Sequence, residues 1–165
     1  TRTADIFHTN RLEPLDGSLA EEIPSFKAGN FLISCRNLNA IAVVDMDKPE
    51  IVWAKSGLWL QQHCATMLPN DHILLFDNQG NYGSSRVVEY DPVAQEITWV
   101  YAGDTENDFY SEKSGAVQRL PNGNTRDATN GRIAKAKTDG IRTINVPTND
   151  PSGHPTSTKS RWHSR

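Results

Sequence analysis

The sequence contains few cysteines and no long apolar run. Only Cys35 and Cys64 occur among 165 residues, which excludes a fold held together by several disulfides. The two cysteines form either a single disulfide or two buried thiols, and we favour two buried thiols. No apolar stretch approaches the roughly 20 residues that a membrane-spanning helix needs. We therefore expect no membrane partner.

Strong charge of one sign is also missing. The formal net charge is −3, so neither a nucleic acid nor an anionic membrane surface is expected as a partner. Hydrophobic residues make up 36% of the chain, which is low for a globular domain. The deficit is concentrated after about residue 121. We therefore expect one folded domain followed by a polar tail.

Several familiar signatures are absent as well. The chain begins at Thr1 without an initiator methionine or a signal-peptide pattern, so we expect it to start inside a longer protein or after processing. It has no Gly-rich phosphate loop, no G-x-S-x-G motif and no C-x-x-C motif. Nucleotide-loop, serine-hydrolase and thioredoxin-like chemistry are therefore not indicated. No cofactor is expected.

The sequence does contain many short apolar runs bounded by Gly, Pro, Asn and Asp. Val, Ile, Trp, Tyr and Phe dominate these runs, and such residues favour strands. A long 3.6-residue periodicity is missing, so the only helical turn we predict is at residues 16–22. The predicted strands are residues 31–34, 40–46, 51–54, 65–68, 73–76, 86–90, 97–101 and 116–120.

The chain also resembles itself. "AVVDMDKPEIVWAKSG" is similar to "RVVEYDPVAQEITWVYAG", each with an acidic residue at a strand end, an Asp/Pro turn and then Trp53 or Trp99. "FKAGNFLIS", "MLPNDHILLF" and "RLPNGNTRDA" match in the same way. Equivalent positions are about 42 to 52 residues apart. A period of that length, with about four short strands per unit, is typical of a β-propeller blade.

The sequence therefore predicts an all-β fold of about three four-stranded propeller units. The units cover about residues 4–56, 57–103 and 104–146, and a polar tail at 147–165 is expected to be disordered. In the third unit Arg126 and Asp127 replace apolar positions, and Ile144 stands where a tryptophan is expected. A closed propeller needs at least four units. We therefore expect a larger ring, or self-association through the open propeller edge.

Two histidines stand at equivalent places where the inner strands begin. His8, with Asn10, lies in "DIFHTNRLE", and His63 precedes the apolar run that ends at Leu68; Gly115 takes this place in the third unit. Histidine can act as a nucleophile or as a general acid or base, and arginine binds oxyanions in two-point fashion. This combination indicates transfer of a tetrahedral oxyanion group. The polar residues that follow the inner strands are Arg36, Asn37, Asn39, Asp77, Asn78 and Arg86.

Structural interpretations of single residues stand beside this one. His63 by itself could be a structural histidine with satisfied hydrogen bonds. His72 is predicted to be an exposed turn residue, and Arg86 could simply pair with Glu89 or with a neighbouring blade. The tryptophans are predicted to pack in the core or between units. The loop at residues 77–81 has oxygen ligands but lacks the alternation of a calcium loop. No short-range ligand pair supports zinc at the histidines, so no metal site is predicted.

These motifs, in order, resemble a known family. "DIFHTNRLEPL", "GNFLISCRNLNAIAVVD", "QQHCATMLPNDHILLFDNQGN" and "SSRVVEYDP" look like segments of the bacterial arylsulfotransferases, over about residues 4–125. The resemblance implies a six-bladed propeller with a funnel-shaped site at the channel mouth. It implies transfer of a sulfuryl group from a phenolic sulfate ester to a phenol, through a sulfated histidine. It also implies a periplasmic or secreted location.

The resemblance assigns roles to individual residues. His8 matches the histidine of the H-x-N motif, His63 matches the histidine after Gln, and Arg86 is the best match to the active-site arginine. The histidines would polarise the phenolic oxygens or exchange a proton with them, and the arginine would hold the sulfuryl oxygens. The residues that we predict to contact the substrate are Asn10, Arg36 and Asn78.

One departure from the family pattern carries an expectation about activity. The nucleophilic histidine is expected just after a segment like "RLPNGNT", where this chain reads "RDATNGRIAKA". Either the nucleophile is missing from this chain, or the altered third unit has displaced it, or the chain represents a subfamily that never used it. Without a covalent carrier at this place, we expect the chain by itself to be inactive or nearly so. The alternatives are a non-catalytic propeller that binds a ligand or protein, and a metal-dependent propeller hydrolase or lactonase.

Overall fold

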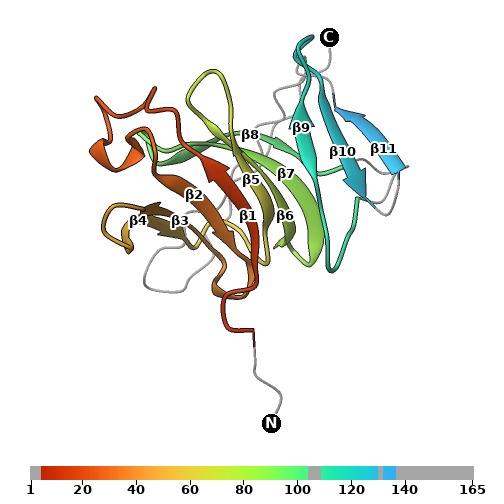
Figure 1. Ribbon diagram of the computed structural model, residues 1–165. Helices are drawn as coiled ribbons and strands as arrows, with labels where there is room; N and C mark the ends of the chain where they lie inside the picture. Colours follow the sequence, from red (N-terminus) through yellow and green to blue (C-terminus); the bar gives the residue numbers. More distant parts are fainter. Residues whose placement is uncertain (1–4, 104–108, 130–131, 137–165) are drawn as a thin grey trace, which may run out of the picture.

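The computed structural model describes residues 5–103, 109–129 and 132–136, and within them it contains strands and short 3-10 turns but no α-helix. The predicted tail at residues 147–165 lies outside the described residues. The chain forms three antiparallel sheets that lie side by side (Figure 1). Neighbouring strands in the sequence are neighbours in each sheet.

The first two sheets each have four strands in sequence order. The first contains β1 (Thr9–Pro14), β2 (Phe31–Cys35), β3 (Ala40–Asp45) and β4 (Glu50–Ser56). The second contains β5 (His63–Met67), β6 (Ile73–Asn81), β7 (Ser84–Asp91) and β8 (Glu96–Tyr101). The third contains β9 (Val117–Arg119), β10 (Thr125–Thr129) and β11 (Arg132–Ala136).

The strand predictions are confirmed, and the helical turn is wrong. Residues 16–22 form a series of turns, and the two 3-10 helices lie at Pro24–Phe26 and Arg36–Leu38. The first of these begins at a proline, whose fixed φ suits a helix start. In the third sheet β10 pairs with both β9 and β11 despite its polar sequence. Backbone pairing therefore survives there without an apolar run.

Two apolar clusters lie between neighbouring sheets and hold them together. The first lies between the first and second sheets and includes Leu32, Val43, Ile73 and Leu75. The second includes Leu74, Phe76, Val87, Phe109 and Val117. Successive residues of β6 thus point into different clusters, since side chains alternate along a strand. Face-to-face packing of consecutive antiparallel sheets, two with four strands and one with three within the described residues, makes the fold a partial β-propeller.

The tryptophans and cysteines take structural places. Trp59 is buried and packs edge-to-face on Tyr90, with ring centroids 5.4 Å apart. Trp53 meets Phe26 in the same way at 5.1 Å, which confirms the predicted packing role. Both cysteines are free, Cys35 buried and Cys64 half-buried. The prediction of two buried thiols is confirmed for Cys35, whereas the thiol of Cys64 is free but only half-buried.

Gly115, two residues before β9, packs closely against the second sheet. A Cβ atom at this position would lie 2.2 Å from Cδ1 of Phe76. We expect Gly115→Ala to lower the free energy of unfolding by about 1–3 kcal/mol, because the buried ring of Phe76 must move. Urea unfolding followed by tryptophan fluorescence measures the change.

The neighbouring exposed position supplies the control. Ala116→Ser is expected to change the free energy of unfolding by less than about 0.5 kcal/mol. Combining Gly115→Ala with Phe76→Leu should cost less than the sum of the single substitutions, since the smaller side chain relieves the clash. Strict additivity would show that the ring of Phe76 does not limit this position.

Candidate functional site

The candidate site lies where the first strands of the first and second sheets begin. His8 directly precedes β1, and His63 is the first residue of β5. Strands β1 and β5 are in contact with each other. The two imidazole rings lie edge to face, with centroids 6.1 Å apart and planes inclined by 76°. The structure therefore brings together the two histidines that the sequence singled out.

His8 lies at the exposed side of this pair. Its side chain is 44% exposed, and its Nδ1 atom lies 3.3 Å from Oδ2 of Asp5. Its backbone amide donates to Oδ1 of the same aspartate at 2.7 Å. His8 has a φ of +46°, a conformation that a non-glycine residue adopts only where local contacts hold it. Asp5 supplies those contacts and can share a proton with the ring.

His63 is buried, and its contacts define its tautomer. Its Nδ1 atom lies 2.8 Å from Oδ1 of Asn78 and 3.1 Å from the backbone oxygen of Gln61. Both partners are acceptors, so Nδ1 carries the proton in the neutral ring. Nε2 has no hydrogen bond to any described residue. The lone pair of Nε2 is therefore available for chemistry.

The environment keeps the imidazole of His63 neutral. Burial lowers the pKa of His63 below its ordinary value of 6.5 because it penalises the charged form. The positive charge of Arg36 and the neighbouring His8 act in the same direction, and the hydrogen bonds to Asn78 and Gln61 oppose them. At neutral pH this histidine is an uncharged base or nucleophile.

The segment before and after His63 has a strained backbone that neighbouring amides hold in place. Gln61 and Cys64 have φ values of +56° and +59°. Asn10 bridges the segment, because its Nδ2 donates to the oxygen of Gln62 at 2.9 Å and its Oδ1 accepts from the amide of Cys64 at 3.4 Å. The amide of Asn10, predicted to contact a substrate, thus braces the strand that carries His63.

Gln62 is a structural residue of the site that the sequence did not reveal. Its side chain is fully buried, and its Nε2 atom donates to the backbone oxygens of Ala40 at 2.7 Å and Cys35 at 3.2 Å. Gln62 therefore ties the beginning of β5 to the first sheet. The sequence shows Gln62 only as the second glutamine in "QQH". A glutamine next to a histidine can be exposed or buried, so its role could not be read from the sequence.

Arg36 presents a positive charge at this end of the sheets. Its Nη2 donates to Oε1 of Gln61 at 2.6 Å and to the oxygen of Glu112 at 3.4 Å, and its Nη1 donates to Oδ1 of Asn37 at 3.1 Å. All of these acceptors are uncharged amides or carbonyls. No carboxylate within the described residues forms an ion pair with Arg36. The guanidinium is therefore held in place yet keeps its charge for an anion.

Arg86 lies in a different environment from the one expected. Its side chain is 8% exposed, and its Nε donates to Oδ2 of Asp77 at 2.7 Å. Its Nη2 donates to the oxygen of Leu58 at 2.7 Å. No hydrogen bond or ion pair within the described residues joins Arg86 to either histidine. The suggested pairing of Arg86 with Glu89 is wrong, because the register of β6 and β7 places Arg86 opposite Asp77.

Asp77 is a fully buried carboxylate that organises the adjoining turn. Its Oδ1 accepts from the amides of Leu60 and Gly80, both at 2.9 Å. Gly80 is required there, since a Cβ would lie 1.9 Å from the carboxylate. Burial raises the pKa of Asp77, whereas the two amides and Arg86 oppose this effect. These contacts leave the carboxylate no open side for a cation.

His72 lies at the opposite end of the second sheet and is not an exposed turn residue. Its side chain is 23% exposed, and its Nδ1 lies 2.8 Å from Oε1 of Glu89. The same carboxylate pairs with Arg119, whose guanidinium lies 5.0 Å from the ring centroid of Trp99. The prediction failed because His72 follows the turn and faces Glu89 across the strands. This cluster ties the third sheet to the second.

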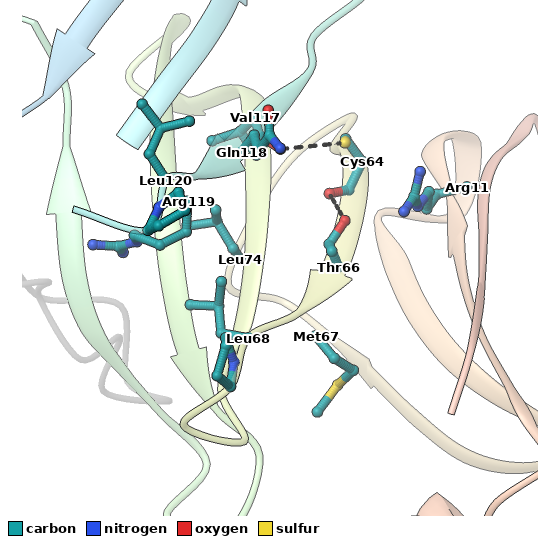
Figure 2. A pocket seen from close by; sticks show the side chains of 12 residues that line it. Arg11, Cys64, Thr66, Met67, Leu68, Leu74, Val117, Gln118, Arg119 and Leu120 are labelled. Carbon is teal, nitrogen blue, oxygen red and sulfur yellow. Dashed lines mark hydrogen bonds between the residues drawn. The ribbon is translucent and has the colours of Figure 1, made fainter. Parts of the chain in front are cut away.

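A hollow of about 690 Å³ runs along β5 between β1 and β9 (Figure 2). Its lining includes Cys64, the residue next to His63, and its walls are mostly apolar, including Met67, Leu68 and Leu74. The two arginines that border it, Arg11 and Arg119, are paired with glutamates. The hollow therefore suits an uncharged apolar group better than an anion.

Metal ligands and membrane spans are not evident within the part of the chain that the structure describes. No group of three or more His, Cys, Asp or Glu residues is arranged to hold a metal ion there. In the same residues, no helix has both the length and the apolar character that crossing a membrane requires.

The buried ion pair between Arg86 and Asp77 yields a stability prediction. We expect Arg86→Ala to lower the free energy of unfolding by about 3–5 kcal/mol at pH 7, because it leaves Asp77 buried without its cation. Without Arg86 the already raised pKa of Asp77 rises further, so the folded protein binds a proton that the unfolded chain does not. Its stability then falls as pH rises, and the loss should be smaller at pH 5.

Urea unfolding at pH 5 and pH 7 measures both values. Lys48→Ala removes an exposed cation in a turn of the first sheet and serves as the charge-matched control, with an expected change below about 0.5 kcal/mol. Equal losses for Arg86→Ala at the two pH values would contradict the assignment to the carboxylate of Asp77.

Comparison with known proteins places this geometry in a family. The model of the arylsulfotransferase (ASST) family matches residues 1–146. No curated protein gives a significant match. Among solved structures, the WD40 β-propeller domain of Doa1 is 16% identical with a TM-score of 0.48, over 66% of this chain and 33% of that one. A protein of unknown function from Bacteroides caccae is 15% identical with a TM-score of 0.47, over 83% of this chain and 48% of that one.

The chain thus spans less than half of the length of either of these structures. Both likenesses are too distant to bear on activity. The family match is different, because it extends over all three sheets and includes both histidines and Arg36. This chain belongs to the arylsulfotransferase family.

Proposed function

We propose that the site transfers a sulfuryl group from a phenolic sulfate ester to a phenol, with His63 as the covalent carrier. One observation carries the proposal. The buried, neutral imidazole of His63 keeps its Nε2 lone pair free while Nδ1 donates to Asn78 and Gln61. An uncharged imidazole nitrogen with its second nitrogen anchored is the arrangement that nucleophilic catalysis requires.

In the first half of the reaction, Nε2 of His63 attacks the sulfur of the donor ester. The bond between sulfur and the phenolic oxygen breaks as the bond between nitrogen and sulfur forms. The leaving phenolate takes a proton from the protonated ring of His8, which lies edge to face with His63 at 6.1 Å. His63 keeps its Nδ1 proton, so the sulfated ring is a cationic, reactive carrier.

In the second half, the acceptor phenol loses its proton to the now neutral His8. Its oxygen attacks the sulfur, the bond between nitrogen and sulfur breaks, and His63 returns to its neutral form with the Nδ1 proton still in place. His8 is protonated again and ready for another donor. Protons and charges balance over the two steps, and no metal or cofactor takes part in this scheme. The pair therefore works as carrier and acid–base.

We assign the binding of the sulfuryl oxygens to Arg36 rather than to Arg86. Arg36 has uncharged partners and acts electrostatically on His63. Arg86 is neutralised by Asp77 and donates to Leu58 as well. A cation that is already positioned stabilises charge on the transferring group without reorganisation. The apolar hollow that begins beside His63 would take the aryl body of a substrate.

This proposal differs from the prediction that the carrier histidine is missing. That prediction placed the nucleophile after residue 125, where the sequence has no histidine. The geometry instead favours a histidine already present, because the contacts of His63 suit a nucleophile better than a residue that only polarises an oxygen. The prediction of an inactive chain stays a prediction. An assay of sulfuryl transfer decides between an inactive chain and a chain that uses His63 as the carrier.

The assay uses a chromogenic phenyl sulfate as donor and a phenol as acceptor. We expect turnover above background, with a loss of at least about a thousandfold in His63→Ala because the covalent carrier is removed. Arg36→Ala should lose about a hundredfold or more, since the charge on the sulfuryl oxygens is then unopposed. His72→Ala and Lys48→Ala are the matched controls and should retain the activity of the parent protein.

Mass spectrometry of protein quenched with donor alone supplies a second reading. It should show one added sulfuryl group in the parent protein and none in His63→Ala. If the folded protein binds phenols but neither catalyses transfer nor accepts a sulfuryl group, catalysis is ruled out and a non-catalytic binding module is favoured. A group found on another residue would reject His63 as the carrier.

The lowered pKa of His63 yields a prediction of its own. The acidic limb of the rate of sulfuryl transfer from donor to protein should lie below pH 6.5, because burial keeps the imidazole of His63 neutral to lower pH than in water. Stopped-flow release of the phenol between pH 4.5 and 8 measures the limb. A midpoint above pH 6.5 would contradict a buried neutral nucleophile.

A further inference from the structure

We propose that Asn78 is a positioning residue that selects Nε2 of His63 as the reactive nitrogen, and that the backbone of residues 111–114 holds Asn78 in this role. The catalytic part of this inference rests on the proposed function, whereas the tautomer of His63 can be tested without it. The inference replaces the predicted contact between Asn78 and the substrate.

The orientation of the Asn78 amide is determined by its nitrogen. Nδ2 donates to the backbone oxygens of Ser111 at 2.7 Å and Ser114 at 3.0 Å. A flipped amide would place its oxygen against these two carbonyls, which can only accept. Oδ1 must therefore face His63, which lies 2.8 Å away at Nδ1. An acceptor fixed at this point requires a proton on Nδ1 and leaves Nε2 bare.

Burial keeps Asn78 away from a substrate. Its side chain is fully buried, both protons of its Nδ2 are used by the two carbonyls, and its oxygen faces the imidazole. Its own backbone oxygen accepts from the hydroxyl of Ser85 at 2.8 Å. Asn78 therefore acts on the reaction only through His63.

The segment that holds Asn78 is anchored on the second sheet. The amide of Ser111 donates to Oγ of Ser85 at 2.8 Å, and the amide of Ser85 donates to the oxygen of Phe109 at 3.0 Å. The ring of Phe109 packs against those of Phe76 and Tyr101, with centroids 5.4 and 5.2 Å away. The carbonyls that orient Asn78 are thus placed by the core between the second and third sheets.

This arrangement gives the third sheet a part in the site. Its leading segment supplies backbone oxygens, and these do not depend on residue type. The histidine position of the third unit is occupied by Gly115, yet the segment just before it supports the histidine of the second unit. The contribution is invisible in side-chain motifs because it is made by the main chain.

The experiment measures the tautomer of His63 directly, by ¹⁵N NMR of protein labelled at histidine, above the pKa of His63. We expect the parent protein to carry the proton on Nδ1. Asn78→Leu should show a substantial population with the proton on Nε2, because only the oxygen of Gln61 at 3.1 Å then remains as an acceptor. Asn78→Asp keeps an acceptor, so it should keep the Nδ1 proton and raise the pKa of His63.

Kinetics of sulfuryl transfer give the second reading. Asn78→Leu should lower kcat by about 10- to 100-fold with little change in KM. A wrong tautomer usually costs more in kcat. The loss is smaller here because the backbone oxygen of Gln61 still accepts from Nδ1 in part of the molecules. Asn78→Asp should recover part of kcat and shift the pH profile toward alkaline values. A rise in KM alone would indicate a substrate contact and overturn the positioning role.

Ser111→Ala is the matched control. It removes a hydroxyl but keeps the backbone oxygen that accepts from Asn78, so the tautomer should not change. Folding is checked by amide spectra, and Asn78→Asp provides the tautomer and pKa test if Asn78→Leu does not fold. An Nδ1 proton that persists in folded Asn78→Leu, or an unchanged pKa in Asn78→Asp, would overturn the inference. The expected tautomers without any turnover would support the inference and reject the proposed function.

Discussion

The burial of β6 on both of its faces is the constraint on which the rest of the structure depends. Ile73 and Leu75 pack toward the first sheet, and Leu74 and Phe76 pack toward the third. The strand then continues into Asp77 and Asn78, which are carried into the same dry interior. Polar groups can remain there only if each finds a partner. The hydrogen bonds of the site are therefore a consequence of the packing of the sheets.

Burial in this interior gives different roles to Arg36 and Arg86, which look alike in the sequence because each follows an inner strand. Arg86 stands opposite Asp77 in the register of β6 and β7, so each neutralises the charge of the other. Arg36 lies at the rim with uncharged partners, and its charge remains available. The same burial lowers the pKa of His63. Where water is excluded determines which groups are structural and which are free to act.

The sequence predicted the strands and the blade period because apolar runs and turn residues are local signals. It also identified His8 and His63, since they occupy equivalent places in repeated units. It could not separate Arg36 from Arg86, because that distinction depends on which residue faces Asp77 across a hairpin. Nor could it show that Asn78 contacts His63, 15 residues away, or that main-chain oxygens orient its amide. Register and burial are properties of the folded chain.

A single site arises here because the repeats are not equivalent. Two neighbouring units place a histidine where the inner strand begins, and the structure puts these rings edge to face. In the third unit the corresponding space is filled by the ring of Phe76, against which a Cβ at position 115 would clash. The ring of Phe76 belongs to the apolar cluster between the second and third sheets, so packing takes up the space that a third side chain would need. Because the blades differ in sequence, the repeated fold contains one pair of histidines in unequal environments, with the ring of His63 buried and the ring of His8 exposed.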